Sequence, residues 1–264
     1  MKDSAIAMAK RLLVDSIWKS ANLEGLGTTF PKTEEILLNV PTTTTSEEVL
    51  FIINMKRAWQ FLLDNIDYDN SLMLLREYNK IVGAMLFHDA GAIRTLPVRI
   101  GGTTWEPEIP NTGIILDALN AIEQIPDITL RALKYFCYVA RTQMFIDGNK
   151  RVAQLIANKV LIQNNIGIFQ VPIERIGEFK TLLVRYYETA DDTALISFMQ
   201  KYCVLLVAQE VTTSQTEVYI EHITRDYTAE QKEKFLSLLP SCYGSMDVED
   251  IYPAIQLARK EVEV

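Results

Sequence analysis

The feature that most constrains this chain is a glycine-containing loop set between two apolar helical segments. Residues 130–140 and 152–160 carry apolar side chains at helical spacing, which predicts two buried helices. The loop Asp147-Gly148-Asn149-Lys150-Arg151 separates them. We therefore expect a helical core in which this loop opens the N-terminus of the second helix.

A loop of this composition is suited to binding phosphate. A helix N-terminus offers unpaired backbone N–H groups and the positive end of a dipole. Gly148 lets a phosphate approach the backbone, while Asn149, Lys150 and Arg151 supply donors. Asp147 is placed to hold Mg²⁺ between phosphates. An ordinary turn that caps a helix explains the same five residues without a ligand.

The rest of the chain reads as mostly α-helical, with one β-prone interruption. Around Gly101-Gly102, residues 95–110 predict a small hairpin. Apolar periodicity, caps and breaks predict the other helices near residues 5–22, 33–38, 46–63, 71–86, 111–122, 173–188, 193–208 and 248–264.

Polar breaks divide the chain into three predicted parts. Pro41 and the threonines after it, and the Ser/Thr-rich stretch 212–214, interrupt the helical pattern. We expect an N-terminal segment over residues 1–45, a core domain over 46–209, and a C-terminal extension or small helical subdomain over 210–264.

Composition narrows the partners and the location. The net charge of −8 argues against a general nucleic-acid binder, while small anionic ligands remain open where local cations gather. Three widely spaced cysteines, Cys137, Cys203 and Cys242, indicate reduced thiols. The N-terminus reads as an amphipathic helix, not a signal peptide, and no apolar run reaches membrane-spanning length. We expect a cytoplasmic protein that does not bind membranes.

The loop and the residues before it, from Gln143 to Arg151, resemble the signature of the Fic family. That signature reads His-Pro-Phe-x-(Asp/Glu)-Gly-Asn-(Gly/Lys)-Arg, with a second Arg after two more residues. Here Gln143 stands at the histidine position and Gln154 at the position of the second arginine.

Two further segments resemble the family in its order along the chain. Ser20-Ala21-Asn22-Leu23-Glu24-Gly25 is similar to the inhibitory motif (Ser/Thr)-x-x-x-Glu-(Gly/Asn) of one Fic class, with Ser20, Glu24 and Gly25 at the defining positions. Val98-Arg99-Ile100-Gly101-Gly102-Thr103 looks like the flap hairpin that positions target side chains.

The resemblance implies a mostly α-helical Fic core with a β-hairpin flap. It also implies binding of ATP with Mg²⁺ and transfer of AMP to a hydroxyl of a protein target. Gly148, Asn149, Lys150, Arg151 and Gln154 would line the nucleotide phosphates, and Asp147 would hold the metal.

Two substitutions weaken the case for ordinary AMP transfer. The family histidine is the general base, and the amide of Gln143 cannot accept a proton, so about 10²- to 10⁴-fold in rate should be lost. The second arginine meets the terminal phosphate and pairs with the inhibitory glutamate, whereas Gln154 is neutral and offers phosphate only an amide donor. His88, just before the flap, is either a distant substitute base or a structural residue, and we assign no role to His222.

Glu24 then lacks its family partner. It either pairs with Arg151, remains solvated, or simply ends a helix. The flap is either an exposed backbone edge that aligns an extended partner segment or an ordinary surface hairpin, and Trp105 would pack its base.

Two function hypotheses follow. The first is an AMP-transferring enzyme with impaired or altered chemistry, and the second is a catalytically inactive module that binds a nucleotide or a protein partner. A DNA-associated regulator is a weaker third, because the acidic C-terminal part lacks a basic helix. The oligomeric state stays open, with a homo-oligomer among the alternatives.

Overall fold

The computed structural model describes residues 2–39, 45–207, 220–221, 223–225, 227–240, 243 and 248–262. Its elements run through the core in the order α1 (Asp3–Arg11), α2 (Leu13–Leu23), α3 (Phe30–Leu37), α4 (Ser46–Asp64), α5 (Leu72–Val82), α6 (Thr112–Glu123), α7 (Ile128–Thr142), α8 (Asn149–Gln163), β1 (Gly167–Phe169), η1 (Ile173–Arg175), α9 (Ile176–Thr189), α10 (Thr193–Tyr202) and β2 (Val204–Leu206). The C-terminal helices are α12 (Ala229–Ser237) and α13 (Val248–Val262).

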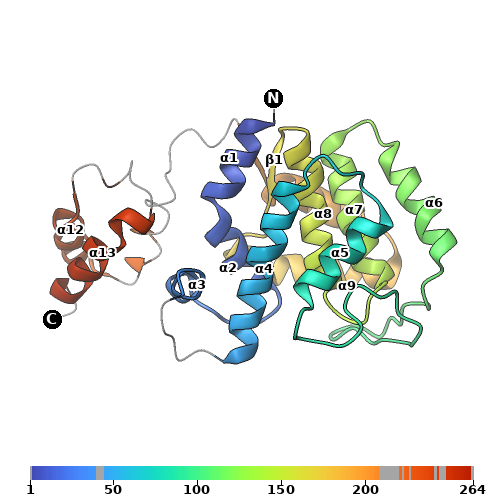
Figure 1. The fold of residues 1–264 in the computed structure, drawn as a ribbon, viewed down its shortest axis with the longest axis horizontal. Helices are drawn as coiled ribbons and strands as arrows, with labels where there is room; N and C mark the ends of the chain where they lie inside the picture. Colours follow the sequence, from blue (N-terminus) through green and yellow to red (C-terminus); the bar gives the residue numbers. More distant parts are fainter. Residues whose placement is uncertain are drawn as a thin grey trace.

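Helix α8 is the centre of the main core. Thirteen of its fifteen residues are buried, as is typical of a helix surrounded on all sides. Its neighbours α7, α5, α4 and α1 pack around it, and Figure 1 shows α8 between α7 and α4. The loop that precedes α8 is therefore anchored to the most buried helix of the protein.

Local capping explains where several helices begin. The side-chain oxygens of Thr45, Ser71, Asn111 and Asp127 accept hydrogen bonds from backbone N–H groups of the first turns of α4, α5, α6 and α7. These starts agree with the predicted helices to within a few residues. The mostly α-helical fold class is confirmed.

The N-terminal segment departs from the prediction of one continuous helix. The chain breaks at Leu12, so that α1 and α2 are separate helices. Residues of both, with Ile36 and Leu37 of α3, lie in the same hydrophobic core as α8. The boundary at residue 46 stays a prediction, and Pro41 and the first threonines after it lie outside the described residues.

The β-structure lies elsewhere than expected. β1 and β2 form a two-stranded antiparallel sheet in which Ile168 is opposite Leu205. Residues 98–107 turn back at Gly101 and Gly102 but form no paired strands. β-prone side chains alone did not specify a ladder there, because this segment is held by contacts to helices instead.

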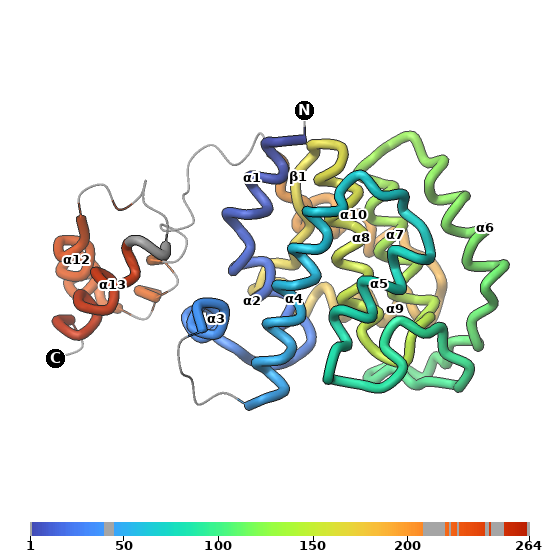
Figure 2. The backbone as a smooth tube through the Cα atoms, viewed as in Figure 1, coloured from blue at the N-terminus to red at the C-terminus, as the bar shows by residue number. Residues whose placement is uncertain are grey.

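The C-terminal helices form a second, smaller core. Phe235 of α12 and Ile251, Ile255 and Ala258 of α13 are buried together with Trp18 of α2 and Phe30 of α3. Figures 1 and 2 show α12 and α13 at the opposite end of the molecule from α6. The predicted break at 212–214 and His222 lie outside the described residues.

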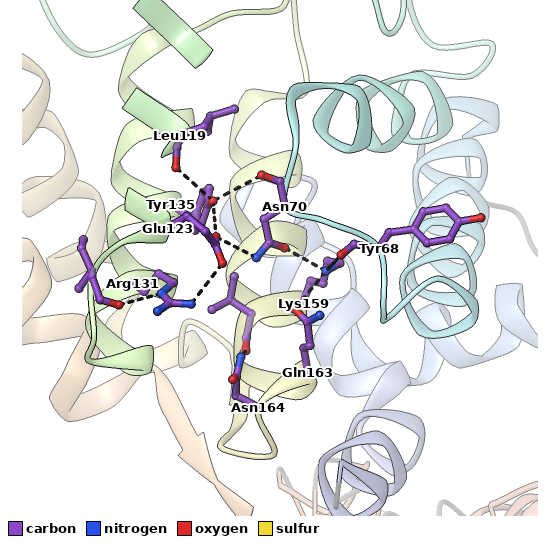
Figure 3. A network of polar contacts seen from close by, with 11 residues as sticks. Tyr68, Asn70, Leu119, Glu123, Arg131, Tyr135, Lys159, Gln163 and Asn164 are labelled. Carbon is purple, nitrogen blue, oxygen red and sulfur yellow. Dashed lines mark hydrogen bonds and ion pairs between the residues drawn. The ribbon is translucent and has the colours of Figure 1, made fainter. Parts of the chain in front are cut away.

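A buried polar network joins the C-terminal half of α8 to α6 and α7 (Figure 3). The Lys159 ammonium is fully buried and donates to Tyr68 O, Asn70 Oδ1 and Gln163 Oε1 at 2.5, 2.9 and 3.2 Å. Asn70 in turn donates to Glu123, which also accepts from the Tyr135 hydroxyl at 2.7 Å. Burial lowers the pKa of Lys159 to about 8, partly offset by the nearby carboxylates.

In the described part of the chain, no helix combines the length and the apolar character needed to cross a membrane. Cys137 and Cys203 are buried free thiols, as predicted. Cys242 lies outside the described residues.

Candidate functional site

Two left-handed residues bracket the loop between α7 and α8. Gln143 ends α7 with φ 46° and Gly148 precedes α8 with φ 78°. Inside the loop, Asn149 accepts from Phe145 N at 3.0 Å and donates to Phe145 O at 2.9 Å. The buried Asn149 side chain thus holds the loop closed, a structural task beside the phosphate contact predicted for it.

Gly148 has a conformational and a steric reason to be glycine. Its φ lies in the region that residues with a Cβ rarely adopt. An added Cβ would also lie 3.0 Å from Asn79 Nδ2, 3.3 Å from Val82 and 3.4 Å from Phe87. Asn79 donates to Asp147 O at 2.8 Å and so fixes the loop to α5.

The side chain of Gln143 bonds to the last turn of α7 and to Asn149. Its Nε2 donates to Ala140 O at 2.6 Å, and its Oε1 accepts from Asn149 Nδ2 at 3.0 Å. Its carbonyl oxygen accepts from Arg94 Nε at 2.5 Å. The group at the family's general-base position is therefore a neutral amide whose polar atoms both bond to neighbours.

Arg151 points into the protein. Its guanidinium donates to Val82 O and to Asp147 Oδ2, each at 3.1 Å. It lies over the rings of Phe51 and Phe87, with centroid distances of 5.2 and 5.7 Å. In this arrangement Arg151 buttresses the loop and orients Asp147.

The Asp147 carboxylate faces solvent while it is held from behind. Its side chain is 64% exposed. One oxygen accepts from Gly148 N at 2.5 Å and the other from Arg151. It is thus an oriented anion at the entrance to α8.

Glu24 pairs with Lys150, which answers the question left open by the sequence. Glu24 Oε2 lies 2.7 Å from Lys150 Nζ, with the two side chains 19% and 30% exposed. This ion pair joins the end of α2 to the first turn of α8. Arg151, the other partner considered for Glu24, pairs with Asp147 instead.

The other residues of the predicted inhibitory motif shape the end of α2. Ser20 is buried, and its carbonyl accepts from Glu24 N at 3.2 Å. Its hydroxyl has no hydrogen-bond partner among the described residues. Gly25 adopts φ 89° directly after Glu24 and ends the helix.

Gln154 is buried and directed toward α2. Its Nε2 donates to Lys150 O at 3.3 Å. It lines a small cavity of about 10 Å³ that is also lined by Ser16, Lys19 and Ser20. That volume is close to the space of one water molecule.

The flap segment is anchored at its base and exposed at its tip. Arg94 donates to the carbonyls of Leu96 at 2.7 Å and Glu108 at 2.5 Å. Near the tip, Arg99 and Glu106 form an exposed ion pair of 3.1 Å. Arg99 stands between Val98 and Ile100 in the chain, and the turn residues Gly101 and Gly102 follow.

The flap also docks on α9. Thr103 donates to Glu188 at 3.1 Å, and Trp105 stacks on Tyr187 with centroids 5.9 Å apart. The predicted packing role of Trp105 is confirmed. Burial, and then the charge of Glu24, raises the pKa of the Tyr187 hydroxyl.

Sequence reasoning missed residues that are far from the loop in the chain but contact the loop or the flap in the fold. Asn79, Phe51, Phe87 and Tyr187 belong to no recognised motif, and only the structure brings them to the loop or the flap. The pairing of Lys150 with Glu24 was missed because the resemblance directed attention to the arginine positions of the motif, Arg151 and Gln154.

The fold is that of several solved structures. The chain matches Fic-1 from C. elegans with a TM-score of 0.63 and 21% identity, over 75% of this chain and 61% of that one. The chain has the Fic fold.

A Fic family protein from Desulfovibrio desulfuricans matches with a TM-score of 0.63 and 14% identity, over 94% of this chain and 75% of that one. A Fic domain containing signaling protein from Bacteroides thetaiotaomicron matches with a TM-score of 0.58 and 18% identity, over 75% of this chain and 85% of that one. This chain corresponds to about three fifths of the C. elegans chain. No family model and no curated protein matches the sequence.

The residues present suit Mg²⁺ only as a partner of bound phosphates. The described residues include no group of three or more His, Cys, Asp or Glu side chains that could hold a metal. Asp147 offers one oriented carboxylate, and Mg²⁺ commonly takes one or two carboxylates together with substrate phosphates and water. Asp147 therefore fits a Mg²⁺–nucleotide complex.

Proposed function

We propose that this Fic-fold chain binds a nucleotide through its phosphates at the N-terminus of α8 and does not transfer AMP. The observation that carries this proposal is the state of Gln143, whose amide nitrogen bonds to Ala140 at the end of α7 and whose amide oxygen bonds to Asn149. A general base must accept a proton from the attacking hydroxyl, and an amide has no basicity for that task. Binding therefore survives the substitution better than catalysis does.

Three groups supply the phosphate site. The first-turn N–H groups of α8 have no intrahelical acceptor and lie at the positive end of its dipole. Lys150 adds a cation at the same turn, and Asp147 would hold Mg²⁺ against the phosphates. Asn149, Arg151 and Gln154 act mainly by shaping the loop, since their side chains bond within the protein.

Glu24 is the inhibitory element of this site. Its ion pair with Lys150 takes up the cation that would otherwise meet a phosphate, and its negative charge repels one. Ser20 and Gly25 place Glu24 at the helix end. The pairing substitutes for the family's contact between the inhibitory glutamate and the arginine that Gln154 replaces here.

The flap is the surface for a protein partner. Arg94 and Trp105 anchor its base, while its tip is exposed and carries backbone groups that no paired strand occupies among the described residues. An extended segment can add to such an edge. Buried free thiols are consistent with a cytoplasmic location.

Calorimetric titration tests nucleotide binding. ATP, ADP and AMP are titrated with and without Mg²⁺ into the native chain and into Lys150→Met, which removes the cation and keeps the helix. The proposal expects ATP and ADP to bind more tightly with Mg²⁺ and to lose affinity in Lys150→Met. Absence of binding for all three nucleotides would sink the proposal.

A further inference from the structure

A second cavity lies beside the flap and is separate from the nucleotide loop. It has a volume of about 400 Å³, opens to solvent, and is lined by Trp105, residues 107–111, the start of α6, the end of α7 and Tyr186 of α9. Thr142, which lines it, directly precedes Gln143. The cavity is therefore adjacent to the place where a flap-bound segment would lie.

Arg141 is a fixed cation in the wall of this cavity. Its Nε and Nη2 both donate to Tyr187 O, at 3.3 and 3.1 Å. Its guanidinium lies 4.5 Å from the centroid of the Trp105 ring and 5.8 Å from that of Tyr186. Nη1 makes no hydrogen bond to any described residue, so its N–H groups are available to a ligand.

Most of the remaining wall is apolar, and its rim is exposed. Ile109 and Ile114 at the rim are 56% and 65% exposed, and Pro107 and Pro110 also line the cavity. Clustered exposed apolar side chains around a concavity are typical of a binding surface. The rim therefore favours a ligand with an apolar body.

The charges facing the cavity are few. Burial raises the pKa of Tyr186 and of Tyr138, so both phenols are neutral near pH 7. Glu108 is the one carboxylate among the cavity's residues, and its side chain is exposed. Arg141 is thus the group that a ligand's charge would meet inside.

We propose that this cavity binds an acidic side chain, together with a neighbouring apolar one, of an extended protein segment that lies along the flap. The carboxylate would accept from Arg141 Nη1 in a charge-assisted hydrogen bond, and the apolar neighbour would cover Ile114 and the prolines. The cavity would then select partners by sequence, which a backbone edge alone cannot do. This inference depends on the proposed role of the flap and is independent of nucleotide binding.

Fluorine NMR of the chain labelled with 5-fluorotryptophan tests the inference without nucleotide. Trp105 reports on the cavity, while Trp18 and Trp59 are buried elsewhere and serve as internal controls. The probe is an acetylated and amidated peptide of alternating leucine and glutamate, compared with its twin in which glutamine replaces glutamate. We expect the glutamate peptide to shift the Trp105 signal saturably and the glutamine twin to bind at least about tenfold more weakly.

Two variants separate binding from folding. Arg141→Gln removes the cation but also touches Tyr187, so Ile114→Asp is the second variant, since it adds a repelling charge at an exposed rim position. Both should weaken binding of the glutamate peptide, read from the Trp105 shift, at least about tenfold and leave the Trp18 and Trp59 signals in place. Equal binding of the two peptides or unchanged binding by Ile114→Asp would overturn the proposal. So would binding of free phenylacetate as tight as that of the glutamate peptide, because a small acid would then suffice without an extended segment.

Discussion

Replacing Glu24 by glutamine should make the chain bind ATP more tightly. The substitution keeps the size of the side chain and removes the charge that holds Lys150 at 2.7 Å. The released ammonium can then turn to a phosphate at the first turn of α8. The repulsion between the Glu24 carboxylate and the phosphates disappears at the same time.

The exposure of the pair sets the size of the effect. Glu24 and Lys150 are 19% and 30% exposed, which is more buried than an ordinary surface pair. Exposed pairs contribute about 0.2–1 kcal/mol, and hydrogen bonds to charged groups about 1.5–3 kcal/mol. An intermediate value of about 1–2 kcal/mol corresponds to roughly 5- to 30-fold tighter binding.

Calorimetry with Mg²⁺–ATP measures this change, and the chain offers a matched control. Glu48 pairs with Lys32 at 3.2 Å between α4 and α3, and Glu48→Gln removes a carboxylate of similar burial from another part of the protein. Glu48→Gln should leave the affinity for ATP unchanged. The reasoning is refuted if Glu24→Gln binds ATP no more tightly than the native chain, or if Glu48→Gln gives the same gain.

Three other outcomes follow from the structure. In urea unfolding, Gly148→Ala should lower the free energy of unfolding by about 2 kcal/mol more than Gly25→Ala does. Both glycines adopt positive φ, but only Gly148 lacks room for a Cβ, so equal losses would contradict the close packing around it. Between pH 7.5 and 9.5 the free energy of unfolding of the native chain should rise by roughly 2 kcal/mol relative to that of Lys159→Met. Lys159 releases its proton near pH 8 in the folded chain but only near about pH 10.4 in the unfolded chain, so the unfolded state binds more protons in this range and stability rises with pH. Parallel pH profiles of the two proteins would refute this. Arg99→Ala should change the unfolding free energy by less than about 0.5 kcal/mol, since its pair with Glu106 is exposed, and a larger loss would show that the flap tip is packed.

Local signals in the sequence predicted the helical fold well. Asn111 and Ser71 cap helices through contacts only two or three residues away, and the apolar positions of α8 mark part of its buried surface. Short-range chemistry of this kind is visible in the chain itself. By contrast, β1 and β2 have three residues each and are separated in the chain by η1, α9 and α10, so neither carries a pattern long enough to recognise.

The site was predicted in composition but not in orientation. The loop residues indicated a phosphate site, yet nothing near Arg151 in the sequence shows that Phe51 and Phe87 enclose its guanidinium. The pairing of Glu24 with Lys150 depends on the packing of α2 against the core, which brings together residues far apart in the chain. Orientation of these charged groups is a tertiary property.

The break at Leu12 and the flap illustrate the same limit. The apolar pattern continues through Leu12 and Leu13, so periodicity alone predicted one helix where there are two. In the flap, the sequence correctly predicted a turn at Gly101 and Gly102. The residues on either side of the turn do not pair as strands, and Trp105 packs on α9 instead.

The most direct test of the account is transfer of label from ATP carrying radioactive α-phosphate. The native chain is compared with Gln143→His, each with and without Glu24→Gly, and self-labelling is followed on gels together with added proteins. The account predicts no transfer above background by the native chain, with or without Glu24→Gly. Label transferred by the native chain as fast as by Gln143→His would contradict the claim that the amide at this position ends the chemistry.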